Sequence, residues 1–217
     1  MNAAYLLIPA GLLLLGLIWA ERAQRPGQVL AFKAPLSALF VLTALLLPHG
    51  SSSYYFLVLA GLILGLVGDV CLALKGEAAF RAGLVSFLLG HVAYVVAFAG
   101  LIPPGGWFNP GFLAICAVSG LAFLWLRSSL GNMMVPVLAY VVVITLMVLA
   151  ALAAVFNEAL PRAGAWLVFG GALVFYLSDL CVARDRFKKP GWDNRLVGLP
   201  LYYGGQFSIA WSVALLS

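Results

Sequence analysis

Residues 54–74 read YYFLVLAGLILGLVGDVCLAL, and Asp69 is the only charged residue in the stretch. Each residue of an α-helix advances the chain by ~1.5 Å, and the hydrocarbon core of a bilayer is ~30 Å thick. About 20 apolar residues are therefore needed to cross it, which is the length of this stretch. We expect residues 54–74 to form a transmembrane helix that carries one carboxyl group inside the membrane.

The rest of the chain has the same apolar character. Of its 217 residues 65% are hydrophobic and 9% are charged, whereas about 25% of the residues in an ordinary soluble domain are charged. Dividing the apolar runs at charged residues and at Pro, Gly and Ser clusters predicts an all-α polytopic membrane protein with eight transmembrane helices. The predicted spans lie near residues 3–20, 30–47, 54–74, 82–101, 110–126, 132–155, 163–183 and 197–216. We expect residues 1–217 to form a single domain, since the length suits one helical bundle.

The basic residues predict the orientation of this bundle. Eleven of the twelve Lys and Arg residues fall in or beside alternate connectors, and Arg162 is the exception. Basic connectors stay on the cytoplasmic side during insertion, so both termini are predicted to be non-cytoplasmic. The same bias explains the net charge of +5, and we expect no nucleic-acid partner. The protein is expected in the inner (cytoplasmic) membrane of a bacterium. No basic segment precedes the first apolar run, so that run is expected to be a retained helix rather than a signal peptide.

Two short segments of the third and seventh spans resemble each other. Residues 68–73 read GDVCLA and residues 178–183 read SDLCVA, an offset of 110 residues. Both spans run in the same direction in the predicted topology. One interpretation is a parallel two-fold repeat of four-helix halves, as some transport proteins show, and the other is a chance match.

Two acidic residues, Asp69 and Asp179, lie within predicted spans. A carboxylate at the centre of a bilayer costs about 2.5–3.5 kcal/mol on insertion scales, so such residues usually face the bundle interior and mark a functional path. A purely structural interhelical hydrogen bond or ion pair is the alternative. Both residues are five or six positions from a basic residue, roughly 7–9 Å along a helix. We therefore expect both carboxyl groups just inside the cytoplasmic membrane surface.

Other polar residues point to the same half of the bundle. Gly61, Gly65 and Gly68 share the helical face of Asp69 and would let a neighbouring helix approach closely. His91 and Tyr94 follow one face of the fourth span, and Tyr202, Tyr203 and Gln206 do so on the eighth. These side chains are candidates for lining a cavity, although an isolated His often only satisfies an interhelical hydrogen bond and Tyr residues also form interfacial belts. Lys33 begins the second span, where it either extends to the headgroups or pairs with an acid.

A metal site and a serine nucleophile find little support in the sequence. Asp69, His91 and Asp179 could supply three ligands, but no HxxxH or HExxH spacing is present and the three Cys residues lie in apolar runs. The sequence contains no Gly-x-Ser-x-Gly motif either. We expect no metal ion and no cofactor.

The chain resembles the YhhN/TMEM86 family of multipass membrane proteins. The matching motifs are KAP at 33–35, GLILGLVGD at 61–69, FLLGHVAY at 87–94, FYLSD at 175–179 and YYGGQ at 202–206. The family usually has Lys and Pro adjacent where Ala34 here separates Lys33 from Pro35. The resemblance implies an ether hydrolase that converts a lysoplasmalogen, a lysophospholipid with a vinyl ether, to a fatty aldehyde and glycerophosphoethanolamine or glycerophosphocholine. It also implies that the protein meets its substrate among membrane lipids.

Vinyl ether hydrolysis needs an acid to protonate the double bond and an anion to stabilise the resulting cation. Asp69 and Asp179 are the predicted catalytic pair, because two carboxyl groups in one shielded site tend to retain a proton between them. The acid and the base are not assigned. Substrate-binding or supporting roles are expected for Lys33, His91, Tyr94, Ser178, Tyr202, Tyr203 and Gln206. A proton-coupled transporter or lipid flippase and a sensory protein without turnover remain alternatives, and the oligomeric state is open.

Overall fold

The structure is a computed structural model that describes residues 3–217. Within these residues the chain forms eight α-helices and four short 3-10 segments, and no strand. The first 3-10 segment, Ala3–Leu6, leads directly into the first helix. The helices are α1 (Leu7–Arg22), α2 (Pro26–Leu46), α3 (Ser53–Ala73), α4 (Glu77–Leu101), α5 (Phe112–Leu126), α6 (Met134–Val155), α7 (Arg162–Phe187) and α8 (Trp192–Leu216).

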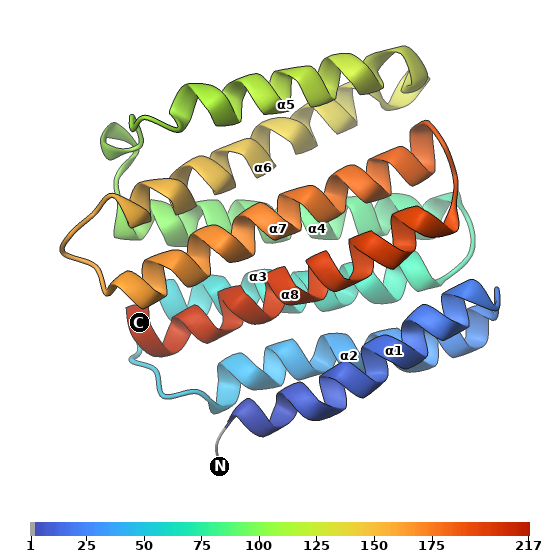
Figure 1. The fold of residues 1–217 in the computed structure, drawn as a ribbon, viewed down its shortest axis with the longest axis horizontal. Coiled ribbons are helices and arrows are strands. Elements are labelled where there is room, and N and C mark those ends of the chain that lie inside the picture. Colours follow the sequence, from blue (N-terminus) through green and yellow to red (C-terminus); the bar gives the residue numbers. More distant parts are fainter. Residues whose placement is uncertain (1–2) are drawn as a thin grey trace.

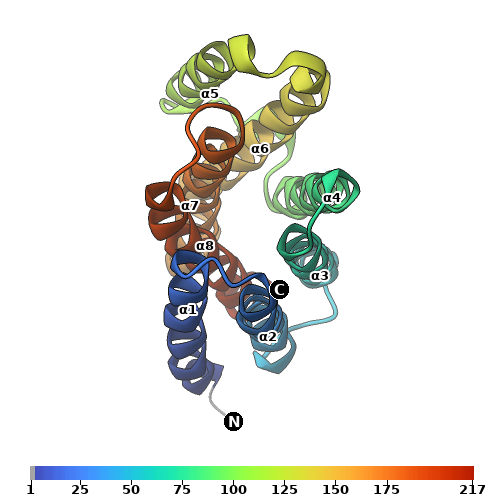
Figure 2. The same cartoon turned by 90° about the vertical axis from the view of Figure 1, so that its right-hand side faces the viewer.

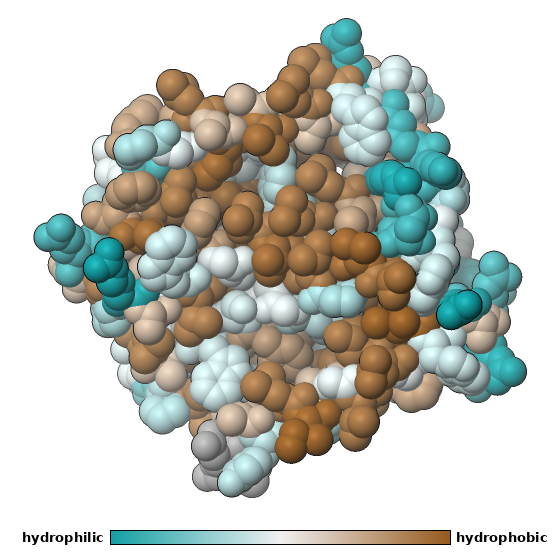
Figure 3. Space-filling view, in the orientation of Figure 1, coloured by the Kyte–Doolittle hydropathy of each residue, from teal (hydrophilic) through white to brown (hydrophobic). Residues whose placement is uncertain are grey.

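Seven of the helices in the described part of the chain, α1 to α7, are long and apolar enough to cross a membrane. Helix α8 is as long as its neighbours, but Tyr202, Tyr203 and Gln206 reduce its apolar character. All three side chains are buried inside the bundle. Apolar side chains cover the face of the molecule seen in Figure 3, and hydrophilic ones gather mainly at its right-hand end. The all-α polytopic prediction is confirmed.

Several helices extend beyond the predicted spans. Helix α4 begins at Glu77 rather than near 82, α7 continues to Phe187 rather than 183, and α8 begins at Trp192 rather than 197. Apolar composition marks the part of a helix inside hydrocarbon, whereas backbone hydrogen bonding continues the helix into the charged layer. The sequence pattern therefore predicted the spans better than the helix ends.

The connectors α1–α2, α3–α4, α5–α6 and α7–α8 lie at one end of the bundle, on the right in Figure 1. We call this the charged end, because it carries Glu77, Arg186, Arg195 and their neighbours. The start of α1 and the end of α8 lie at the opposite end. This arrangement follows the predicted alternation of the helices. The side of the membrane that each end faces stays a prediction.

Helix packing supports the internal repeat. Helices α3 and α4 form one closely packed pair and α7 and α8 the other, and α8 packs against α2 as α4 packs against α6 (Figure 2). A repeat that maps α1–α4 onto α5–α8 would produce these two correspondences. The repeat itself and the single-domain organisation stay predictions.

The α7–α8 pair depends on two glycines that face each other. A Cβ atom on Gly205 would lie 2.8 Å from the backbone oxygen of Gly171, and one on Gly171 would lie 3.0 Å from that of Gly205. Gly205→Ala should therefore destabilise the protein by about 1–3 kcal/mol, because a backbone atom cannot rotate away. The control is Gly204→Ala on the same helix, where a Cβ meets nothing within 4 Å. The midpoint of thermal unfolding in detergent should fall for Gly205→Ala alone, and equal midpoints would contradict this packing.

Candidate active site

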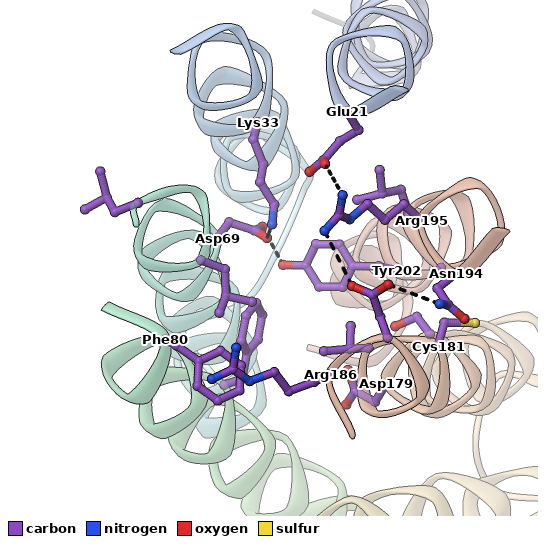
Figure 4. A pocket seen from close by; sticks show the side chains of 18 of the residues that line it. Glu21, Lys33, Asp69, Phe80, Asp179, Cys181, Arg186, Asn194, Arg195 and Tyr202 are labelled. Atoms are coloured by element: carbon purple, nitrogen blue, oxygen red, sulfur yellow. Dashed lines mark hydrogen bonds and ion pairs between the residues drawn. The ribbon is translucent and has the colours of Figure 1, made fainter. Parts of the chain in front are cut away.

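A cavity of about 500 Å³ opens at the charged end of the bundle, between α1 to α4 on one side and α7 and α8 on the other (Figure 4). Ion pairs surround its mouth. Arg186 of α7 reaches Glu77 of α4, with Nη2 2.5 Å from Oε1. Arg195 of α8 reaches Glu21 of α1, with Nη1 3.3 Å from Oε2. Both pairs join helices that are distant in sequence, so they hold the mouth together.

Asp69 lies at the wall of this cavity and is only 1% exposed. The Nζ atom of Lys33 is 3.1 Å from its Oδ1 atom, and the hydroxyls of Ser37 and Tyr202 each donate to Oδ2 at 2.6 Å. Lys33 and Ser37 are one turn apart on α2 and so share a face. Of the two interpretations of Lys33, pairing with an acid is the one that the structure shows. One cation and two hydroxyl donors therefore stabilise the Asp69 carboxylate.

A chain of hydroxyl and amide groups continues behind Tyr202. Gln206 donates from Nε2 to the Tyr202 hydroxyl at 3.2 Å, and Tyr94 donates to Gln206 Oε1 at 2.7 Å. On the other side, the Ser37 hydroxyl donates its hydrogen bond to Asp69. It therefore accepts a hydrogen bond from the Tyr203 hydroxyl at 3.1 Å. Tyr94, Tyr203 and Gln206 are fully buried and do not line the cavity. They hold Tyr202 and Ser37 in position and do not reach a substrate directly.

Asp179 lies at the wall of the same cavity, and 20% of its side chain is exposed. The Tyr140 hydroxyl of α6 donates to its Oδ2 atom at 2.9 Å. The Nε2 atom of His91 on α4 is 3.6 Å from that oxygen, which is too long for a hydrogen bond. The Nδ1 atom of His91 is 2.7 Å from the Phe87 carbonyl oxygen, and Nδ1 must donate because a carbonyl only accepts.

His91 Nε2 is therefore a buried nitrogen atom that faces a carboxyl group. Within residues 3–217 it has no hydrogen-bond partner. Leaving such an atom unpaired is costly, and a shift of less than ~1 Å would bring it within hydrogen-bond range of Asp179. The geometry suits one proton held between Asp179 Oδ2 and His91 Nε2. Each aspartate thus has its own partners, which differs from the expected arrangement in which the two carboxyl groups share a proton with each other.

Three aromatic rings connect the surroundings of the two acids. Tyr202 packs edge-to-face on Phe175 at 5.1 Å and on Phe87 at 5.8 Å between ring centroids, and Phe175 lies 4.6 Å from the His91 ring. These rings fill the space below the cavity with apolar surface. A wall of low polarity strengthens the electrostatic interactions of both acids.

The partners of the two acids occupy corresponding helices. Asp69 of α3 is held from α2 and α8, and Asp179 of α7 is held from α6 and α4. The repeat of four-helix halves maps each of these three helices onto its counterpart. This correspondence is a second observation that supports the repeat.

The sequence pattern of the YhhN family matches residues 28–213. The chain belongs to the YhhN family. Among its relatives, lysoplasmalogenase TMEM86A from Bos taurus is 33% identical over 171 residues, which is 77% of this chain and 68% of that protein. Lysoplasmalogenase TMEM86B from Sus scrofa is 30% identical over 91% of this chain and 80% of its own length. A lysoplasmalogenase from Mycobacterium bovis is 31% identical over 80% of this chain and 64% of its own length. No solved structure matches the chain.

The structure places five of the nine predicted site residues of this YhhN protein in the wall of the cavity. Lys33, Asp69, Ser178, Asp179 and Tyr202 line it, and the other predicted residues support those that do. Ser178 is buried and donates to the Phe175 carbonyl oxygen at 2.8 Å, so its hydroxyl is engaged with the backbone. The proposed role of each residue stays a prediction.

Two hydroxyl groups that contact the acids of this YhhN protein, and the charged mouth of its cavity, are parts of the site that the sequence did not predict. Ser37 lies four residues after Lys33, a spacing that puts both on one helical face and could have revealed it. Tyr140 lies in an otherwise apolar span and gave no such signal. The charges of the mouth were interpreted only as orientation signals.

The donor set does not resemble a metal centre of the usual kind. Among residues 3–217 no three His, Cys, Asp or Glu side chains gather in a way that could hold a metal ion. The independence of this YhhN protein from metal stays a prediction, which a chelator tests below.

Proposed function

We propose that this protein hydrolyses the vinyl ether bond of lysoplasmalogens, releasing a fatty aldehyde and glycerophosphoethanolamine or glycerophosphocholine. The names of its relatives point to this reaction. The observation that carries the proposal for this chain is the contact of Asp179 with His91 at the wall of a cavity that opens at the charged end. A carboxyl group with a nearby proton reservoir and access to substrate is the acid that this reaction requires.

In the proposed reaction Asp179 transfers its proton to the double-bond carbon that is not bonded to oxygen and that carries the hydrocarbon chain. The electrons of that bond form the new carbon–hydrogen bond, and the positive charge is shared by the ether carbon and oxygen as an oxocarbenium ion. Asp179 is then an anion beside the new cation. Asp69 borders the same cavity, with its negative charge balanced by Lys33. His91 holds the proton together with Asp179 between turnovers.

Water completes the reaction. It adds to the ether carbon and gives a proton to the Asp179 carboxylate, so the product of this step is a hemiacetal. The hemiacetal then loses its hydroxyl proton, the glycerol oxygen gains a proton, and the bond between the carbon and that oxygen breaks. The sum is one water consumed for one aldehyde and one alcohol released, and Asp179 ends in its starting state.

The charged mouth suits the phosphodiester headgroup. Arg186 and Arg195 are 41% and 46% exposed at their side chains, so each can donate a hydrogen bond to a phosphate oxygen while it keeps its acidic partner. Lys33 is occupied with Asp69 in the wall of the cavity. We propose that Arg186 and Arg195 bind the headgroup. Lys33 instead balances the charge of Asp69.

The charged end is proposed to face the cytoplasm, because basic connectors stay inside during insertion. Substrate would then enter from the cytoplasmic leaflet of a bacterial inner membrane. A C-terminal alkaline phosphatase fusion, which folds only outside the cytoplasm, should be active, and a C-terminal fluorescent protein that needs the cytoplasm should be dark. The reverse pattern of the two reporters would invert this orientation.

A proton-coupled transporter or lipid flippase is the second candidate, since paired membrane acids and a parallel repeat also occur in transporters. The names of the relatives favour hydrolysis over transport. The decisive experiment is mass spectrometry of purified protein incubated with vinyl-ether, alkyl-ether and acyl lysolipids of ethanolamine and choline, with and without a chelator.

We expect aldehyde from the vinyl-ether lipids only, and equal yields with the chelator. Intact lipids throughout, together with lipid or proton movement in liposomes, would replace hydrolysis by transport. A chelator-sensitive yield would contradict the metal-independent mechanism.

A further inference from the structure

A second, smaller cavity of about 80 Å³ lies between α4, α5, α6 and α7. We call it the chain groove. Its wall is formed mainly by aliphatic and aromatic side chains, among them Leu126 of α5, Val137 and Val141 of α6, and Leu180 and Phe187 of α7. The groove therefore differs in chemistry from the charged cavity described above.

The polar groups of the chain groove are almost all satisfied by the protein. Tyr176 donates its hydroxyl to Ser119 Oγ at 3.2 Å, and Tyr140 donates its hydroxyl to Asp179. Both tyrosines thus present their rings to the groove and keep their hydroxyls in contacts with the protein. An occupant of this groove gains apolar contact along the wall and meets one carboxyl group, that of Asp179.

Asp179 belongs to the wall of both cavities. One carboxyl group therefore borders a charged cavity on one side and an apolar groove on the other. A molecule that touches Asp179 while filling both must have a charged part and an apolar part joined at the level of this residue. A lysolipid with a single hydrocarbon chain has this form, and its ether bond lies at that junction.

We infer that the chain groove binds the first carbons of the hydrocarbon chain of a single-chain lipid whose headgroup occupies the charged cavity. This inference rests on the proposed function and names a subsite for its substrate. The groove is too small for a whole chain, so the remaining carbons continue from it into the bilayer. Helix α5 lies at the edge of the bundle (Figure 2), and among its residues only Ser119 and Leu126 are buried.

A larger side chain on α5 should narrow the chain groove, which gives a test of this inference. Ala122 lines the groove, and Ala122→Phe would fill part of it. Ala117→Phe is the matched control, because it adds the same ring to the same helix at an exposed position outside the groove. Ala122→Leu adds a smaller side chain and should give an intermediate effect, which keeps the test valid if the Phe variant folds poorly.

Two measurements are made on wild type and variants in the same detergent. The first is kcat/KM for vinyl-ether lysolipids with chains of increasing length. The second is the shift in unfolding temperature caused by non-hydrolysable alkyl-ether lysolipids of the same lengths. Each buried methylene strengthens binding about fourfold, so displacing two or three of them should cost long-chain lipids about tenfold or more in Ala122→Phe. Chains too short to enter the groove, and chains of every length with Ala117→Phe, should be little affected.

The two measurements separate this inference from the proposed reaction. If wild type releases no aldehyde but its stabilisation by alkyl-ether lipids depends on chain length and is lost in Ala122→Phe, the groove stands and hydrolysis does not. If Ala122→Phe and Ala117→Phe give the same chain-length dependence in both measurements, the groove does not bind the chain.

Discussion

Asp179→Asn should lower the rate of aldehyde release by about 10²–10⁴-fold, the usual contribution of a general acid. The amide has the size of the carboxyl group and can still accept the Tyr140 hydroxyl, so the helix packing around it is preserved. It cannot deliver an acidic proton to carbon, and it cannot hold a proton with His91. The loss should appear in kcat and leave the unfolding temperature close to that of wild type.

The control for this variant is Glu158→Gln. It removes a carboxylate from an exposed position in the connector between α6 and α7, far from the charged end. Rates and unfolding temperature should both match wild type. A kcat for Asp179→Asn within a few-fold of wild type would remove Asp179 from the chemistry, whatever the effect on KM.

Of the substitutions proposed, those that break the Lys33–Asp69 pair should cause the largest loss in the free energy of unfolding. Lys33→Met and Asp69→Asn should each lower the free energy of unfolding by about 3–5 kcal/mol, because each leaves one buried charge without its partner. The double variant should lose much less than the sum of the two, since neither charge is then present. Aldehyde release should be lost in Asp69→Asn and in the double variant.

The measurement is a double-mutant cycle from unfolding curves in one detergent. The control is the exposed pair of Arg184 and Asp193, whose side chains are 34% and 59% exposed. Asp193→Asn should cost only about 0–1 kcal/mol, since water screens an exposed pair. Additive losses for Lys33→Met and Asp69→Asn would show that the two side chains do not depend on each other.

The spans and the two membrane acids could be predicted from the sequence because each depends on local composition. A run such as 54–74 has to cross a bilayer, and a lone Asp within it has to face the interior. For Lys33 the sequence left two environments open, the lipid headgroups and an acidic partner. The ends of α7 and α8 could not be predicted, because a helix continues past the apolar residues that mark it.

The partners of each acid depend on how distant helices rotate and approach, which local composition does not specify. Ser37 and Tyr140 each lie on a helix other than that of the acid they contact, and Tyr140 lies in a span with little polar character. The chain groove depends on four helices together, so no single motif indicates it. The contact of His91 with Asp179 also depends on how α4 and α7 rotate and approach. The sequence marks both residues as candidates but does not show that they meet.

The most direct test of the proposed chemistry is hydrolysis of a vinyl-ether lysolipid by the purified protein in heavy water, with the aldehyde reduced to an alcohol as it forms. Protonation of carbon by Asp179 predicts one deuterium atom on the carbon next to the former carbonyl group in wild type and in Glu158→Gln, and product formation about 10²–10⁴-fold slower in Asp179→Asn. Aldehyde without deuterium at that carbon would contradict the account, because the bond would then have broken without proton transfer to the double bond.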